Sequence, residues 1–116
     1  MDYEFEKKWK EKLDQLSAQF GGPLDYAAIL MLIGYQELGQ DYRTYKKDQK
    51  VELMHIGVCA VLVDYGYYQF TGRDEEGWPH FERVQPLPPL SADEQELLIK
   101  KAIVAYFEKY HPLVQP

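Results

Sequence analysis

Three residue types that could do chemistry together occur at helical spacing in the middle of the chain. Glu52, His55 and Cys59 are three and four positions apart, which places their side chains on one side of an α-helix. A carboxylate, an imidazole and a thiol within reach of one another could ligate a divalent transition metal such as zinc. Alternatively, the histidine could lower the pKa of the cysteine and activate it. The third interpretation is a buried cysteine beside a histidine that hydrogen-bonds a backbone carbonyl or Glu52.

The metal pattern is incomplete when compared with known kinds of site. Structural zinc takes four ligands, and dimetal helical bundles use Glu-x-x-His twice, whereas this chain has that pattern once, at Glu52 and His55. No glycine-rich phosphate loop, serine nucleophile elbow or dinucleotide fingerprint occurs in the sequence. The sequence therefore indicates no catalytic or cofactor-binding residue. A metal-binding protein or metal-dependent enzyme that uses Glu52, His55 and Cys59 is kept as the alternative to a protein-interaction module.

A second group of candidate residues is aromatic and follows the metal pattern along the chain. Large amphipathic rings are favoured in protein interfaces because they give contact area at low rotamer cost. The candidate partner-binding residues are Tyr67, Tyr68, Phe70, Trp78 and Phe81. The other interpretation is that these rings pack inward over the helices and leave only their hydroxyl groups at the surface.

Gln36 and Glu37 are polar residues near the end of an apolar segment. They either face a groove or lie on the exposed side of their helix.

The elements that position these residues are mostly helical. Apolar residues at steps of three and four predict helices over about 2–20, 24–38, 46–64 and 91–110. Pro23 suits the first turn of the second helix, and Gly39 and Gly66 can end the second and third helices in the left-handed conformation. Ser91 and Glu94 form a capping box at the start of the last helix.

The aromatic stretch between the third and fourth helices predicts a β-hairpin over about 67–84. Tyr68 and Phe70 alternate with polar neighbours, and Asp74 and Gly77 stand at the first and fourth positions favoured in a type I turn. Because an isolated two-stranded hairpin is marginal in water, its aromatic face should lie on apolar surface, such as the flank of the third helix.

These elements predict a mainly α fold for a single domain of residues 1–116: a compact four-helix bundle with a β-hairpin inserted between helices 3 and 4, or α+β if the hairpin is counted. The third predicted helix is apolar around most of its circumference, so we expect it to be the hub of the molecule. The second helix is similarly apolar. This surplus of apolar surface favours a homo-oligomer, with a second subunit or the hairpin supplying the remaining cover.

Composition narrows the class of protein further. With 19 acidic and 13 basic residues the net charge is −6, which works against binding to a phosphate backbone, so nucleic acid is not an expected partner. The longest apolar run is far shorter than the ~20 residues needed to cross a bilayer. A single cysteine, Cys59, together with an N-terminus that lacks a signal-peptide pattern, favours the cytoplasm.

The segments LIGYQELGQ, LMHIGVC and GRDEEGWPHF resemble segments of small hypothetical proteins of Bacteroidetes, over most of the chain from the second helix onward. That family has no assigned activity, so the resemblance transfers no site residue; it implies a stand-alone bacterial cytoplasmic protein. Together, the sequence favours a non-enzymatic protein-interaction or assembly module that uses the aromatic hairpin, with an unknown protein partner.

Overall fold

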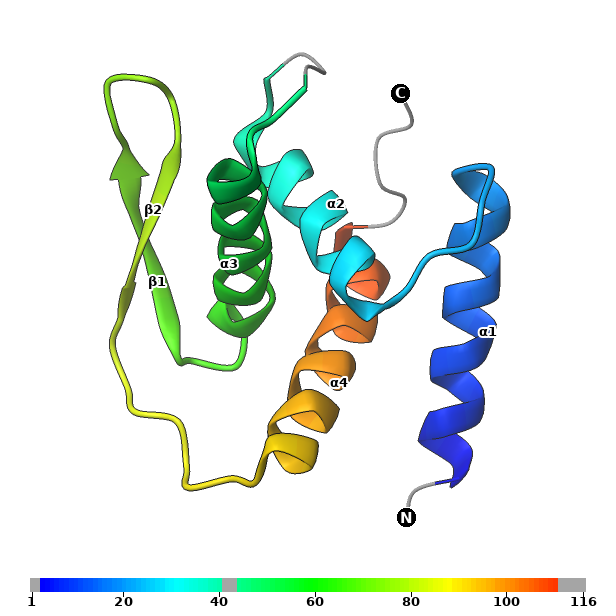
Figure 1. Ribbon diagram of the computed structural model, residues 1–116. Coiled ribbons are helices and arrows are strands. Elements are labelled where there is room, and N and C mark those ends of the chain that lie inside the picture. The colour runs from blue at the N-terminus through cyan, green and yellow to red at the C-terminus, as the bar shows by residue number, and fades with distance from the viewer. Residues whose placement is uncertain (1–2, 41–43, 111–116) are drawn as a thin grey trace.

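In the part of the chain that the structure describes, the fold is mainly α, with four helices and one antiparallel hairpin (Figure 1). The computed structural model describes residues 3–40 and 44–110. In chain order the elements are α1 (Tyr3–Gln19), α2 (Tyr26–Leu38), α3 (Lys47–Val63), β1 (Tyr68–Arg73), β2 (Pro79–Arg83) and α4 (Ala92–Tyr110). The predicted fold class is therefore confirmed, with the hairpin between the third and fourth helices.

The α2–α3 pair is held together by two glycines that let the helix backbones touch. A methyl group on Gly34 would overlap the backbone carbonyl of Leu53, and one on Gly57 would overlap the backbone carbonyl of Leu30. The contact is thus reciprocal: each helix has one glycine that lies against the backbone of the other helix. Ile33 and Leu53 beside the crossing are fully buried. Close approach of this kind maximises dispersion contacts between the helices.

Helix α3 is the hub of the described chain, as predicted. It contacts α2, α4 and both strands of the hairpin. Its side chains Leu53, Cys59 and Leu62 are almost completely buried. The sequence predicted that α3 is covered around most of its circumference. Its first turns are an exception, because Val51 is 61% exposed.

Helix α4 packs on α3, and α1 packs on α4 as the outermost helix (Figure 1). Trp9 is buried against this layer, and the Lys100 ammonium lies 5.4 Å from the centre of its ring. The Lys8 Nζ and a Glu108 carboxylate oxygen are 2.8 Å apart. Helix α1 is therefore attached to α4 by the buried Trp9 ring, with charged contacts around it.

The helix ends follow capping rules, with one correction. Helix α2 begins at Tyr26 rather than Leu24, because the Asp25 carboxylate accepts a hydrogen bond of 2.8 Å from the backbone N–H of Ala28 and thereby sets the first turn. Gly39 ends α2 with a φ of 68°, as predicted. The predicted capping box of Ser91 and Glu94 is also confirmed, since each side chain accepts a hydrogen bond from the backbone N–H of the other residue.

The hairpin has a β-bulge at a position that the sequence did not indicate, within β1 and not at Gly77. Phe70 pairs with Phe81, but the next pair is Gly72 with His80, so Thr71 is the extra residue. Beyond the bulge, the predicted turn is confirmed: the Gly77 N–H donates to the Asp74 carbonyl over 2.9 Å, and Gly77 has a φ of 87°.

Two clusters of buried side chains form the interior of the described part of the chain. The larger one joins all four helices, with Ile33 and Ile103 at its centre. The smaller one joins α2, α3 and the hairpin; its buried members are Leu38, Tyr45, Leu53, Ile56 and Trp78. The hairpin thus packs on α3 as predicted, and the end of α2 also contributes to the shared cluster.

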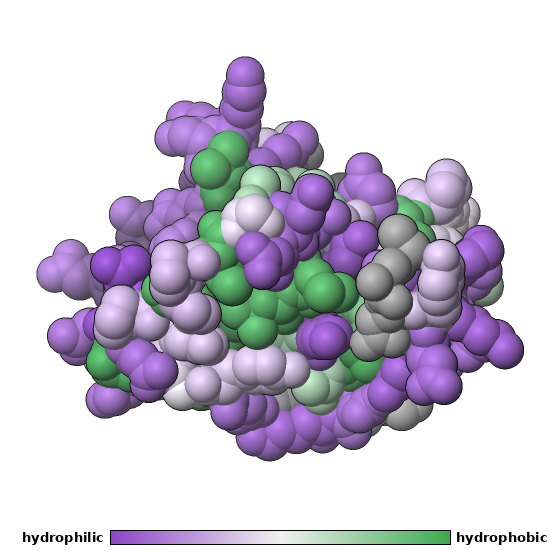
Figure 2. All heavy atoms as spheres, turned by 90° about the horizontal axis from the view of Figure 1, so that it is seen from below, coloured by the Kyte–Doolittle hydropathy of each residue, from purple (hydrophilic) through white to green (hydrophobic). Residues whose placement is uncertain are grey.

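Some apolar surface stays uncovered. Figure 2 shows apolar side chains gathered in the middle of the face seen from below, with polar side chains around them. The predicted homo-oligomer, which would cover such surface, stays a prediction.

Candidate functional site

The tip of the hairpin is anchored in the smaller cluster by Trp78. Its side chain is only 5% exposed, and its ring meets the Tyr45 ring edge to face, with centroids 6.0 Å apart. Tyr45 in turn meets Tyr35 at 5.0 Å. Trp78 is therefore a core residue that fixes the hairpin and is not available at the surface. Of the predicted partner-binding residues, Tyr67, Tyr68, Phe70 and Phe81 therefore remain as candidates.

Those four rings differ in exposure. Tyr67 and Tyr68 are half-buried against the larger cluster, and Phe81 is half-buried against the smaller one. Phe70 is 48% exposed and meets the Phe81 ring edge to face, with centroids 5.7 Å apart. The inward-packing interpretation thus holds for most of the hairpin's rings, and the accessible apolar surface of the strands is centred on Phe70.

A guanidinium fork fixes the hairpin to the end of α2. The Arg73 guanidinium donates to three backbone carbonyls: those of Glu37 (2.7 Å), Leu38 (3.1 Å) and Gly77 (2.9 Å). The last carbonyls of a helix have no partner within it, so a cation here satisfies them and complements the helix dipole. The Gln40 side-chain amide adds a bond of 2.8 Å to the Glu76 carbonyl.

Sequence reasoning did not find the role of Arg73. The only available signal was that Gly39 ends α2 and leaves orphan carbonyls, and this signal does not name the donor.

Asp74 organises the turn that follows Arg73. One carboxylate oxygen accepts from the backbone N–H groups of Glu76 (2.9 Å) and Trp78 (3.0 Å), and the other lies 2.9 Å from His80 Nε2. The hydrogen bond with His80, followed by the one from Trp78, lowers the pKa of Asp74 below its ordinary value of 3.8. These hydrogen bonds hold the tip in one conformation.

Glu37 connects α2 to α4. Its carboxylate accepts a hydrogen bond of 3.3 Å from the Tyr106 hydroxyl, while its backbone carbonyl accepts from Arg73. Burial raises the pKa of Glu37, and the Tyr106 hydrogen bond and the Arg73 charge only partly oppose this. Glu37 is therefore half-buried between elements, neither in the predicted groove nor on the fully exposed side of α2.

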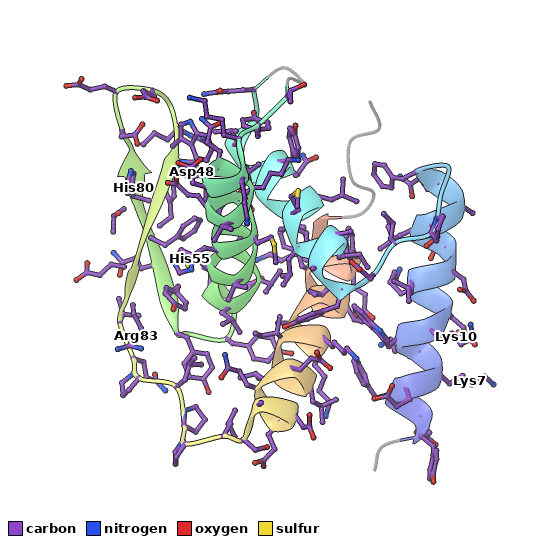
Figure 3. All side chains as sticks on the ribbon, in the orientation of Figure 1. Lys7, Lys10, Asp48, His55, His80 and Arg83 are labelled. Carbon is purple, nitrogen blue, oxygen red and sulfur yellow. The ribbon has the colours of Figure 1, made fainter. Side chains whose placement is uncertain are left out.

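The predicted metal residues lie on α3 with unequal exposure. Glu52 and His55 are exposed and Cys59 is buried. The Cys59 sulfur is 3.5 Å from His55 Nε2, and Figure 3 shows His55 on the side of α3 that faces the hairpin. Burial raises the pKa of the Cys59 thiol to about 11. The pair thus resembles the buried-thiol interpretation more than an activated nucleophile.

Within residues 3–40 and 44–110, no three His, Cys, Asp or Glu side chains are grouped so that they could hold a metal ion. Metal binding through Glu52, His55 and Cys59 remains a prediction that this geometry does not favour. Of the two other histidines of the chain, His80 lies on the hairpin and His111 lies outside the described residues.

Comparisons with known proteins add no family assignment. None of the protein-family models matches the chain, and neither the curated proteins nor the solved structures give a match. The resemblance to small proteins of Bacteroidetes stays a prediction. In the part of the chain that the structure describes, no helix is both long and apolar enough to span a membrane.

Proposed function

We propose that this chain is a non-enzymatic protein-interaction module, and that it binds its partner through the hairpin surface made by Tyr67, Tyr68, Phe70 and Phe81. The observation that carries the proposal is the Phe70 ring, which is 48% exposed on a strand whose far end is held by other contacts. Aromatic rings in fixed positions make efficient contacts because little rotamer freedom is lost on binding.

The anchoring of the hairpin supports this proposal. Arg73 binds the carbonyl groups at the end of α2, and Trp78 is buried beyond the turn. Because these two anchors and the contacts with α3 hold the strands in place, Phe70 is presented in one orientation. A preorganised surface of this kind reduces the entropy cost of association.

A matched pair of substitutions tests the proposal. Phe70→Ala removes the exposed hairpin ring, whereas Tyr3→Ala removes a ring that is 77% exposed on α1, on the opposite side of the molecule (Figure 1). Immobilised wild-type protein should capture a partner from an extract of the cells in which the protein naturally occurs. We expect Phe70→Ala to lose that partner and Tyr3→Ala to retain it. Equal capture by both variants, with both folded by circular dichroism, would show that the hairpin surface is not the binding site.

A further inference from the structure

Within residues 3–40 and 44–110, no strand pairs with the outer edge of β1. The Val84 N–H donates to the Tyr67 carbonyl over 3.0 Å, and the pairing continues in register through Gln69 with Glu82. Because antiparallel pairs alternate, the backbone of Gln69 is turned toward β2, and the backbones of Tyr68 and Phe70 are turned outward. The consecutive side chains of Gln69, Phe70 and Thr71 are exposed, as expected along an open edge.

The two edges of the hairpin differ in the features that prevent strand pairing. Strand β2 contains Pro79, Glu82 and Arg83, and proline and charged residues on an edge oppose the addition of another strand. In contrast, β1 carries its charge only at its last residue, Arg73, which lies beyond the bulge and donates to carbonyls of α2; residues 65–72 contain no charged side chain. In a chain of net charge −6, a neutral edge is where a second copy can approach with the least like-charge repulsion.

We infer that β1 pairs with β1 of a second copy of this chain, in antiparallel orientation about a two-fold axis at Gln69. This inference rests on the proposed function and names the partner. In this register Tyr68 of each copy lies opposite Phe70 of the other, so that the outward backbone groups pair and two aromatic cross-strand contacts form. The bulge at Thr71 ends the pairing, which keeps the added sheet short.

The arrangement also fits the packing of α3 beneath the hairpin. Strands are about 4.8 Å apart, so the mid-lines of the two hairpins would be about 10 Å apart. Helices pack at about 8–10 Å. Since α3 contacts both strands of its own hairpin, the two copies of α3 would lie side by side on one face of the four-stranded sheet.

Symmetric disulfide formation tests the register. Residue 69 of each copy would face its equivalent in a non-hydrogen-bonded pair, where Cα atoms are about 4.5 Å apart, within the range for a disulfide. We therefore expect Gln69→Cys to form a covalent dimer under mild oxidation, in about tenfold greater yield than Glu82→Cys on the other strand. Both variants also carry the native, buried thiol of Cys59. Wild-type protein oxidised in the same way shows how much cross-linking Cys59 gives by itself. Equal yields from the two variants would overturn the register.

A charge substitution gives an independent readout. Gln69→Lys would place two ammonium groups directly opposite each other, which destabilises a strand pair, so it should lower the dimer fraction in sedimentation velocity, whereas Glu82→Lys should not. A wild-type chain that is monomeric at every concentration, with no cross-link at position 69, would overturn self-pairing. If Phe70→Ala still lost a captured partner in that case, the proposed function would stand with a different partner; if it lost none, both would fail.

Discussion

At the scale of single residues, the contact between Cys59 and His55 does not make a reactive thiol. An activating histidine stabilises the thiolate, yet burial raises the pKa of Cys59 to about 11. At pH 7 almost all of the thiol is therefore protonated and covered by protein. We expect iodoacetamide to modify the folded chain at least about a hundredfold more slowly than the chain in urea, as followed by mass spectrometry. Rapid modification of the native protein would contradict this interpretation and revive the activated-cysteine hypothesis.

Glu37 should make stability depend on pH in the direction opposite to an ordinary ion-paired carboxylate. Its folded pKa lies above the ordinary value of 4.5 because of burial, so between these values the folded state binds more protons than the unfolded state. Stability therefore falls as the pH rises through this window. Glu37→Gln removes this titration while its side-chain carbonyl can still accept from Tyr106.

The measurement is urea unfolding of both proteins between pH 4 and pH 7. Relative to wild type, we expect Glu37→Gln to gain free energy of unfolding as the pH rises, and to be at least as stable at pH 7. If the variant instead lost stability progressively toward pH 7, the carboxylate would be stabilising and its pKa would be lowered in the folded state.

At the scale of elements, the crossing of α2 and α3 depends on the absence of two side chains. Alanine at Gly34 or Gly57 would place a methyl group against a backbone carbonyl of the other helix, and a backbone cannot rotate away as a side chain can. Each substitution should lower the free energy of unfolding by about 3 kcal/mol, at the upper end of overpacking costs. Gly22→Ala is the control, since nothing lies within 4 Å of its added methyl. Similar urea midpoints for all three variants would show that the helices separate at little cost.

The attachment of the hairpin to α2 should depend on the shape of the Arg73 side chain and not only on its charge. A lysine ammonium is a compact point charge and lacks the planar fork that reaches several acceptors. Because Arg73 is exposed, Arg73→Lys should cost only about 1 kcal/mol. The loss should appear as faster amide exchange in residues 68–83. Arg83→Lys, on the neighbouring strand opposite Tyr68, is the matched control and should leave this exchange unchanged.

At the scale of the whole molecule, local signals in the sequence predicted the elements and their order. Each helix lies within about two residues of its predicted range because periodicity and capping act over one or two turns. The turn at Asp74 and Gly77 was predictable for the same reason. Asp25 was missed because Pro23 offered a competing helix start nearby, and aspartate is favoured at the cap itself.

The features that join elements could not be predicted from one sequence. Gly34 and Gly57 each look like an unfavourable helix-interior glycine, and their meaning appears only when the two helices are placed together. The same is true of Arg73, whose two acceptors on α2 lie 35 and 36 positions earlier in the chain. The sequence placed the five candidate rings on or beside the hairpin, but the division between the buried Trp78 and the exposed Phe70 required the fold.

The two tryptophans allow the cooperativity of the whole molecule to be measured, because each is buried in a different cluster. Trp9 belongs to the larger cluster and Trp78 to the smaller one. Helices α2 and α3 contribute to both clusters and are locked at the glycine crossing, so we expect the clusters to unfold together. In urea, Trp9 fluorescence in a Trp78→Phe variant and Trp78 fluorescence in a Trp9→Phe variant should each give a midpoint that matches the far-ultraviolet circular dichroism of the same variant. If the Trp78 signal changed at lower urea than the helices, the hairpin would open as a separate unit, and its surface would not be preorganised.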